Sequence, residues 1–286
     1  MTPTAKRPGA SQQPASAGVR MRLAILGGGK IGEALLSGLL RGPMAVGQIV
    51  VSEHNPDRAS YLAQTYSVAA VSVEDAVKTC DVLLIAVKPQ DIMTLLAEIA
   101  PHAQGQVVIS VAAGITTKRI EAGLPPGIPV VRTMPNTPAL VDQAMTAISA
   151  GTHATEEHLA AAESVLSSVG RVIRVPESQL DAVTALSGSG PAYFFFLVEA
   201  MIDAGILLGL PRNVAAELIV QTALGSATML RDTGEHPVQL REAVTSPGGT
   251  TIMAIRELER HGVRAALLAA IEAARDRSVE LGRADD

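Results

Sequence analysis

Three spaced glycines, Gly27, Gly29 and Gly32, are the first feature of the sequence that indicates a chemical function. They follow a short apolar run at residues 22–26 and precede a segment whose apolar residues recur with the period of a helix. A glycine turn between a strand and a helix is typical of dinucleotide sites, because the free N–H groups of the helix N-terminus face the phosphates. We expect Gly27 to form the tight turn, Gly29 to admit a pyrophosphate and Gly32 to let the helix pack closely. The alternative is a plain glycine turn in a doubly wound fold.

The residues after the next predicted strand, 48–52, bear on which dinucleotide binds. Glu53 favours NAD, because a carboxylate at this place binds a ribose hydroxyl. Ser52 together with Arg58 favours NADP, because a hydroxyl and a guanidinium can hold a 2′-phosphate. The sequence leaves both cofactors open.

Three further strand ends carry candidate site residues. Lys88, in the turn at residues 86–89, is a candidate cofactor contact, with a solvated turn residue as the alternative. Residues 110–114 have small side chains that suit a backbone lying against a nicotinamide ring, or a simple strand-to-helix turn. In the loop 132–138, two prolines hold an Asn and two Thr in a rigid segment, which makes it a further candidate.

Two glycine-rich segments, 186–193 and 245–251, each lead into a predicted helix in the second half of the chain. For the first segment, helix capping is the favoured interpretation. For the second we favour a binding site, because N–H groups at a helix N-terminus suit a carboxylate and its hydroxyls suit a neighbouring polar atom. The residues of this candidate site are Ser246, Gly248, Gly249, Thr250 and Thr251.

The elements that must position these residues change in character along the chain. Strands are predicted at 22–26, 48–52, 81–87, 106–111, 129–132, 144–150 and 171–175, with helices at 56–66, 116–122 and 156–169 between them. Beyond about residue 181 only helices are predicted, at 191–208, 213–233, 238–244, 250–261 and 264–281. The predicted fold class is α/β, with an N-terminal Rossmann-like doubly wound sheet followed by an all-helical domain.

This pattern predicts a disordered tail at residues 1–20, a dinucleotide-binding domain at 21–180 and a helical domain at 181–286. The second domain is expected to be a helical bundle. Its helices are apolar over more than one stripe, so we expect part of their surface to meet another subunit in at least a dimer. An intramolecular core is the alternative, because helical periodicity does not distinguish the two.

The composition excludes several classes of protein. Of the 286 residues, 48% are hydrophobic and 18% are charged, which excludes overall disorder. A formal charge of -5 without a basic stripe argues against a nucleic-acid partner. A single cysteine, Cys80, and six scattered histidines predict no metal site.

The chain is expected to be soluble and cytoplasmic. Residues 1–20 lack the apolar run of a secretory signal, although their basic, acid-free character leaves an organelle transit peptide as an alternative. The most apolar window, 192–210, contains Glu199 and Asp203, which are costly at the centre of a bilayer. We therefore expect no membrane partner.

Six motifs in this order resemble the pyrroline-5-carboxylate reductase family, over residues 21–282. They are LGGGKIG (26–32), AVKPQ (86–90), VAAG (111–114), RTMPNTP (132–138), LSGSGPAY (186–193) and TSPGGTT (245–251). The resemblance implies reduction of 1-pyrroline-5-carboxylate to L-proline, with NADP(H) preferred and NAD(H) as a second cofactor. It also implies a helical dimerisation domain, with homodimers often assembled into a larger ring.

Site residues are carried over from the family motif by motif. The resemblance implies cofactor binding by Leu26, Gly27, Gly28, Gly29, Lys30, Ile31, Gly32, Ser52, Ala86, Val87, Lys88, Pro89, Ala112, Ala113 and Gly114. It implies substrate binding by Ser246, Gly248, Gly249, Thr250 and Thr251. Two departures are Glu53, an acid beside the expected phosphate-binding Ser52, and Val73, where many relatives carry an Asn that reaches the cofactor.

The chemistry fits a site with few acids and bases. A protonated cyclic imine accepts hydride without an enzyme nucleophile, so the protein has to position, orient and desolvate. We expect the amides of Gly248, Gly249 and Thr250 to hold the substrate carboxylate, and Thr251 to hydrogen-bond the ring nitrogen as the catalytic residue. The site should then lie at the domain boundary, where a second subunit can complete it.

Two other functions are alternatives to this one. A two-domain reductase of the 3-hydroxyacid or 6-phosphogluconate dehydrogenase type needs a Lys on the helical domain as acid or base. The chain has no Lys after Lys118, which argues against that class. A dinucleotide sensor without enzymatic activity would keep Gly27, Gly29 and Gly32 but would not need the hydroxyl-rich segment at 245–251.

Overall fold

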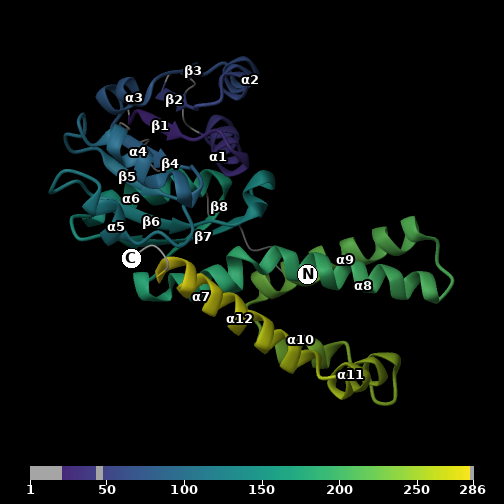
Figure 1. The fold of residues 1–286 in the computed structure, drawn as a ribbon. Coiled ribbons are helices and arrows are strands. Elements are labelled where there is room, and N and C mark those ends of the chain that lie inside the picture. The colour runs from purple at the N-terminus through teal and green to yellow at the C-terminus, as the bar shows by residue number, and fades with distance from the viewer. Residues whose placement is uncertain (1–20, 43–47, 284–286) are drawn as a thin grey trace, which may run out of the picture.

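A computed structural model describes residues 21–42 and 48–283 of the chain. The tail predicted at residues 1–20 lies outside the described residues. An α/β domain is followed by helices that extend away from it, as Figure 1 shows. The predicted α/β class, with a doubly wound sheet followed by helices, is therefore confirmed.

The α/β domain is built on one eight-stranded sheet in the order β3-β2-β1-β4-β5-β6-β7-β8. Its strands are β1 (Leu23–Leu26), β2 (Ile49–Ser52), β3 (Ala69–Ala70), β4 (Val82–Ile85), β5 (Val107–Ser110), β6 (Val130–Met134), β7 (Ala144–Ala150) and β8 (Gly170–Arg174). All neighbours are parallel except β6 and β7. The register places Leu26 opposite both Ser52 and Ile85, so the loops after β1, β2 and β4 open at the same edge of the sheet.

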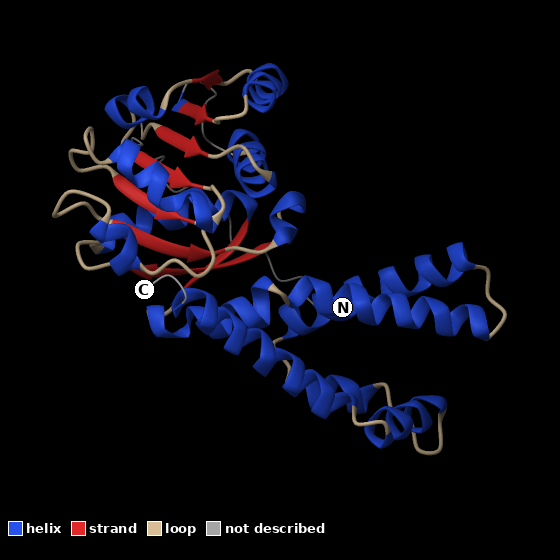
Figure 2. Ribbon diagram, viewed as in Figure 1, coloured by secondary structure: helices blue, strands red, loops and turns tan. Residues whose placement is uncertain are grey.

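The central strands are short and apolar because both faces of the sheet are covered (Figure 2). All four residues of β1 are buried, and so are those of β4. Alternate residues enter two separate cores, with Leu23 and Ile25 in one and Ala24 and Leu26 in the other. The small aliphatic side chains of the sequence therefore form two helix-covered layers.

The helices of this domain are mostly those predicted. They are α1 (Lys30–Arg41), α2 (Pro56–Tyr66), α3 (Val73–Thr79), α4 (Ile92–Ile99), α5 (Thr117–Ala122) and α6 (Glu156–Leu166). The α/β domain also contains four short 3-10 helices among the described residues, namely η2 (Pro89–Asp91), η3 (Thr137–Val141), η4 (Ser167–Val169) and η5 (Glu177–Gln179). The two-residue strand β3 and the helices α3 and α4 were not predicted. Of these, α3 is capped by the Ser72 side chain, which accepts the Asp75 amide at 3.0 Å.

After β8 the described chain is helical. It comprises α7 (Leu180–Val183), a π-helical turn η6 (Thr184–Gly188), α8 (Gly190–Leu207), α9 (Arg212–Thr233), α10 (Pro237–Ala243), α11 (Thr250–Arg260) and α12 (Val263–Arg283). Helices α8 and α9 form one hairpin, which we call the first arm, and α10 to α12 form the second arm. The arms diverge from each other in Figure 1. At its C-terminal end α12 returns to α7, where the Ser278 hydroxyl donates to Asp181 at 2.7 Å.

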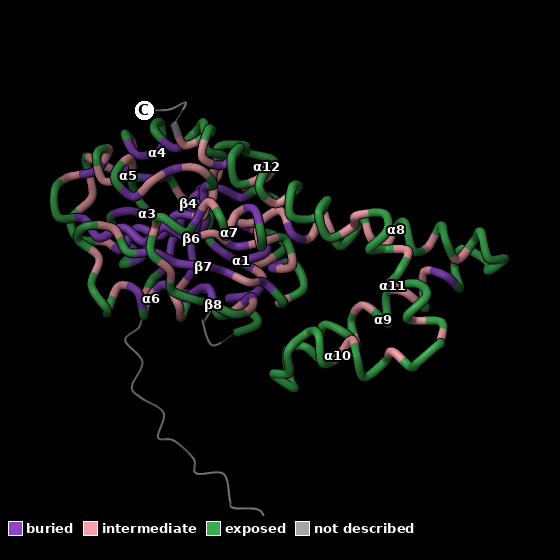
Figure 3. Tube along the Cα trace, turned by 90° about the horizontal axis from the view of Figure 1, so that it is seen from below, coloured by how far each residue is buried: buried purple, intermediate pink, exposed green. Residues whose placement is uncertain are grey.

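The helical bundle expected from the sequence is not formed within one chain. Between residues 190 and 282 only Gly190, Ala215 and Ser278 are buried. Figure 3 shows the buried residues gathered in the α/β domain and the arms exposed or half-buried. Phe194, Phe195 and Phe196, the three phenylalanines of the chain, are 65–70% exposed. Helical periodicity correctly indicated apolar faces, but a single chain leaves those faces uncovered.

The stretch Glu177–Leu207 is long and apolar enough to cross a membrane by length and composition. It is the one such stretch in the described residues, and Glu199 and Asp203 interrupt it. Its second part is α8 on the first arm, whose exposed side chains include Phe194, Phe195 and Phe196.

Candidate functional site

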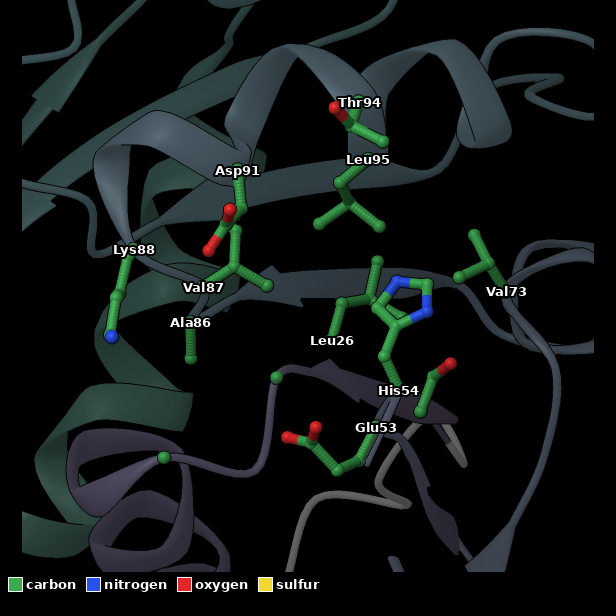
Figure 4. Close-up of a pocket in the computed structure, with 13 residues that line it drawn as sticks. Leu26, Glu53, His54, Val73, Ala86, Val87, Lys88, Asp91, Thr94 and Leu95 are labelled. Carbon is green, nitrogen blue, oxygen red and sulfur yellow. The ribbon is translucent and has the colours of Figure 1, made fainter. Parts of the chain in front are cut away.

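A cavity of about 490 Å³ lies at the edge of the sheet where β1, β2 and β4 end. Its walls come from these strand ends and from the first residues of α3 and α4, as Figure 4 shows. The lining residues are Leu26, Gly27, Gly29, Ser52, Glu53, His54, Val73, Ala86, Val87, Lys88, Asp91, Thr94 and Leu95. A ligand at the carboxyl ends of parallel strands is the usual arrangement in doubly wound sheets.

In the turn between β1 and α1, the local geometry is different at each of Gly27, Gly29 and Gly32. Gly27 has φ +109°, and a Cβ there would lie 2.8 Å from the Ala86 carbonyl carbon. A Cβ on Gly32 would lie 2.1 Å from the Gly27 carbonyl oxygen, so only glycine lets α1 approach the turn. A Cβ on Gly29 would meet nothing within 4 Å, and this residue borders the cavity.

These residues fit a dinucleotide phosphate. Helix α1 begins at Lys30, and no side chain caps its first N–H groups. Those groups have no partner inside the helix, and the positive end of the helix dipole lies beside them. With open space at Gly29, the turn can bring backbone donors against a pyrophosphate.

The predicted cofactor-binding residues are only partly brought together. Those that line the cavity are Leu26, Gly27, Gly29, Ser52, Ala86, Val87 and Lys88. Four others, Gly28, Lys30, Ile31 and Gly32, belong to the same turn and helix start but do not line the cavity. Pro89 opens η2 beside the cavity.

Residues 112–114 follow the neighbouring strand β5 and lie outside this cavity. Gly114 instead lies against α12, because a Cβ on it would be 3.8 Å from the Leu281 Cβ. The loop after β5 therefore packs against the end of the second arm.

Arg58 does not line the cavity. Its Nε donates to the Gly28 carbonyl at 2.7 Å, and its Nη2 donates to Glu33 at 2.5 Å. Burial raises the pKa of Glu33, but hydrogen bonds from Arg58 and Tyr66 more than offset it, so this pKa is lowered overall. In the described structure Arg58 therefore secures α1 and the glycine turn.

Several cavity residues were not predicted. His54, Asp91, Thr94 and Leu95 line the cavity without having been named as site residues. Val73, which the sequence analysis did name, lies in the cavity wall at the start of α3. Thr94 and Leu95 belong to α4, whose buried residues Ile92, Leu95, Leu96 and Ile99 follow a helical period. That period was the signal that would have placed them.

The loop before α11 holds the residues predicted to bind substrate. Gly248 has φ +69°, which favours glycine, and a Cβ on Gly249 would lie 2.3 Å from the Ser246 hydroxyl oxygen. Local geometry therefore accounts for both glycines without a ligand. The Gly249 amide donates to the Ser246 carbonyl at 3.1 Å, so it would have to leave this bond to hold a carboxylate.

The backbone N–H groups of Gly248 and Thr250 remain available to bind a ligand. Thr250 is the first residue of α11, so its N–H has no intrahelical acceptor. Gly248 precedes it in the exposed turn, and Thr251 is half-buried. The loop thus offers the amides of Gly248 and Thr250 together with the hydroxyls of Ser246 and Thr251.

Within one chain this loop and the cavity are far apart. Helix α11 lies at the outer end of the second arm, away from the α/β domain, in both Figure 1 and Figure 3. The predicted site at the domain boundary is therefore not assembled by a single chain. The reason is that α12 spans the whole distance between the α/β domain and α11.

The loop 132–138 and the segment 186–193, two further candidate motifs, are in contact. The Asn136 side chain, in the loop after β6, donates to the carbonyl and hydroxyl of Ser187 in η6. A Cβ on Gly188 would lie 2.6 Å from the Met134 Cε, so this contact is close. Among the described residues, no group of three or more His, Cys, Asp or Glu is arranged to hold a metal ion.

Comparison with known proteins agrees with this architecture. A family model described as pyrroline-5-carboxylate reductase dimerisation matches residues 177–281. A second, described as NADP oxidoreductase coenzyme F420-dependent, matches residues 22–114. The dimerisation match begins at η5, where the strands end and the helices begin, and the oxidoreductase match lies within the sheet-containing part of the chain.

Relatives cover nearly the whole chain. A pyrroline-5-carboxylate reductase of Mycobacterium tuberculosis is 50% identical, over 91% of this chain and 96% of its own length. A solved pyrroline-5-carboxylate reductase structure from Coxiella burnetii has a TM-score of 0.88 at 36% identity, covering 92% of this chain and 99% of that one. A Plasmodium falciparum pyrroline carboxylate reductase with NADP bound has a TM-score of 0.83 at 27% identity, covering 92% and 98%. On this identity and coverage, the chain belongs to the pyrroline-5-carboxylate reductase family.

Proposed function

We propose that this protein reduces 1-pyrroline-5-carboxylate to L-proline by hydride transfer from NAD(P)H, the last step of proline biosynthesis. The observation that carries the proposal is the match, at 50% identity over 91% of the chain, to a pyrroline-5-carboxylate reductase. The glycine-bordered cavity and the loop before α11 support it. We assign cofactor binding to residues 21–180, and substrate binding with dimerisation to residues 181–286.

NADP(H) is the preferred cofactor in this proposal, with NAD(H) as the second. A relative with NADP bound supports this choice. The open space at Gly29 and the start of α1 would hold the pyrophosphate, and Ser52 would lie at the adenosine end. Residues 86–89 and 112–114, at the ends of β4 and β5, are proposed for the nicotinamide end. The reduced nicotinamide supplies the hydride when it is bound.

The loop before α11 suits a small cyclic carboxylate. The amides of Gly248 and Thr250, at the positive end of the α11 dipole, would bind the substrate carboxylate. The Thr251 hydroxyl oxygen would accept a hydrogen bond from the protonated ring nitrogen, and Ser246 would bind a neighbouring polar atom. These groups bind and orient, which is what the reaction needs, because an iminium carbon accepts hydride without an enzyme nucleophile.

A second copy of the chain completes the site in this proposal. Within one chain the cavity lies in the α/β domain and the loop before α11 lies at the outer end of the second arm. Hydride transfer therefore needs this loop from another copy or a large movement of the second arm. The exposed apolar side chains of both arms support the first route, because a soluble chain rarely leaves so much apolar surface uncovered. We therefore propose a homodimer formed by the arms, further assembled into a larger ring.

The same dimer accounts for the apolar stretch Glu177–Leu207. This stretch lies within the segment that matches the dimerisation model, residues 177–281. A second copy would cover it, and Glu199 and Asp203 would be costly inside a bilayer. We propose a cytoplasmic enzyme without a membrane or nucleic-acid partner.

The reaction is tested by mixing the purified protein with 1-pyrroline-5-carboxylate and NADPH or NADH. We expect loss of the absorbance of the reduced nicotinamide, with one proline formed for each cofactor oxidised. Protein that binds the cofactor but forms no proline would contradict the proposal and favour a dinucleotide sensor. Light scattering tests the assembly, and a mass equal to that of one 29.6 kDa chain would contradict the dimer.

A further inference from the structure

Glu53 occupies the adenosine side of the cavity with its carboxylate already fixed. Its Oε2 accepts the Gly28 amide at 2.7 Å, and its Oε1 accepts the Asn55 amide at 2.9 Å. Each carboxylate oxygen has a second lone pair, so both can accept one more hydrogen bond. Glu53 lines the cavity directly after β2, beside Ser52 (Figure 4).

The charge of this carboxylate is not neutralised by its neighbours. Arg58 is paired with Glu33 and with the Gly28 carbonyl. The His54 ring lies 3.8 Å from Glu98. Within residues 21–42 and 48–283, no Lys, Arg or His forms an ion pair with Glu53.

A fixed, unpaired carboxylate treats the two cofactors differently. The adenosine ribose of NADH carries two neighbouring hydroxyls, which donate to a carboxylate. NADPH has a 2′-phosphate in place of one of them, and a carboxylate repels that group because both are negative. The Gly28 and Asn55 amides hold the carboxylate in place, so it cannot easily turn away from a phosphate.

We propose that Glu53 determines how well this enzyme uses NADH relative to NADPH, by binding the ribose hydroxyls of NADH and opposing the 2′-phosphate of NADPH. The inference rests on the proposed reductase function and assigns it a specificity-determining residue. Arg58, the cation expected from the sequence to hold a 2′-phosphate, is committed to α1 and the glycine turn.

The test compares Glu53→Gln with the wild type, using the dissociation constants of NADH and NADPH and the kcat/KM for each cofactor. Glutamine keeps the size and a hydrogen-bond acceptor but removes the charge. We expect the preference for NADPH over NADH to rise by about tenfold in both measurements, since one close like-charge contact is removed. Should Glu53→Gln fail to fold, Glu53→Ser removes the same charge with a smaller side chain.

The matched control is Glu235→Gln, which removes one negative charge at an exposed position outside the cavity. We expect its cofactor preference to equal that of the wild type. An equal loss of affinity for both cofactors in Glu53→Gln would show that Glu53 only secures the glycine turn, and would overturn the inference. A shifted binding preference in a protein that does not reduce 1-pyrroline-5-carboxylate would support the inference and refute the reductase function.

Discussion

The side-chain amide of Asn136 donates to the Ser187 carbonyl at 3.2 Å and to its hydroxyl at 3.3 Å. The Asn136 oxygen in turn accepts the Met145 amide at 2.9 Å. One side chain thus joins the loop after β6, the start of β7 and the π-helical turn from which the first arm departs.

We predict that Asn136→Ala lowers the free energy of unfolding by about 1–3 kcal/mol, because the partly buried Met145 amide and Ser187 carbonyl lose their partner. Ser187→Ala should cost less, since it removes only the hydroxyl and leaves the carbonyl bonded. Urea unfolding of the two variants measures the difference. Equal losses would show that Asn136 does not join the two halves.

Glu177 makes the stability of the inter-domain segment depend on pH. Its carboxylate accepts hydrogen bonds from the Thr117 amide at 2.7 Å, the Thr117 hydroxyl at 2.6 Å and Arg132 at 3.1 Å. Burial raises the pKa of Glu177, but these donors more than offset it, so the pKa lies below its ordinary 4.5. A carboxyl group whose pKa is lower in the folded state than in the unfolded state stabilises the fold when the pH is above its unfolded-state pKa. This stabilisation is lost as the pH falls through the folded-state pKa.

We therefore expect Glu177→Gln to be less stable than the wild type at neutral pH, with the gap narrowing as the pH falls below 4.5. Urea unfolding at a series of pH values measures the gap. Glu235→Gln, at an exposed turn, controls for the loss of one carboxylate. A gap for Glu177→Gln that stays constant with pH would mean that its charge does not contribute.

Gly29 and Gly32 give a matched pair that separates cofactor binding from folding. The space around Gly29 is open and its φ is −65°, so Gly29→Ala should change the free energy of unfolding by less than about 0.5 kcal/mol. Its methyl group would extend into the proposed pyrophosphate site, and we expect NADPH to bind roughly tenfold more weakly, a loss of about 1.4 kcal/mol.

Gly32→Ala should destabilise the fold, unlike Gly29→Ala. Its Cβ would meet the Gly27 carbonyl oxygen at 2.1 Å, so the fold should lose about 1–3 kcal/mol from steric strain. Thermal unfolding and fluorescence titration with NADPH measure both effects. Undiminished NADPH affinity in Gly29→Ala would remove Gly29 from the cofactor site.

Local signals in the sequence were sufficient for most elements of the fold. Strand 144–150 was predicted with the bounds of β7, and Pro56 marked the start of α2. The helix α3, with seven residues, gives few turns for a clear period, whereas the helical period of α4 is present in the sequence and was overlooked. The strand β3 has two exposed residues and carries no pattern at all.

The candidate site was less accessible to sequence reasoning, because its contacts join distant residues. Gly28 and Glu53 are 25 positions apart, and Asn136 and Ser187 are 51 apart. No local pattern encodes such pairs. The apolar stripes of α8 and α9 predicted burial in a bundle or against another subunit, and the structure shows that a single chain does not bury them.

Thr251 provides the test of whether one site is shared between two chains. Thr251→Val removes the hydroxyl proposed to accept from the ring nitrogen, so kcat should fall while NADPH affinity stays near that of the wild type. Thr250→Val should affect turnover less, because Thr250 is proposed to act through its amide, which valine retains. Unchanged kinetics in Thr251→Val would remove Thr251 from the site.

A mixed dimer then decides between the two arrangements. One chain carries Thr251→Val, the other carries Gly29→Trp to block the cavity, and two affinity tags isolate the dimers that contain one of each. If a cavity works with the α11 loop of the other chain, one of the two sites combines an intact cavity with an intact loop, and the mixed dimer should recover about half of the wild-type kcat. If cavity and loop work within one chain, each chain carries one defect and activity stays at the level of the single variants. The position of α11 at the outer end of the second arm predicts the first result.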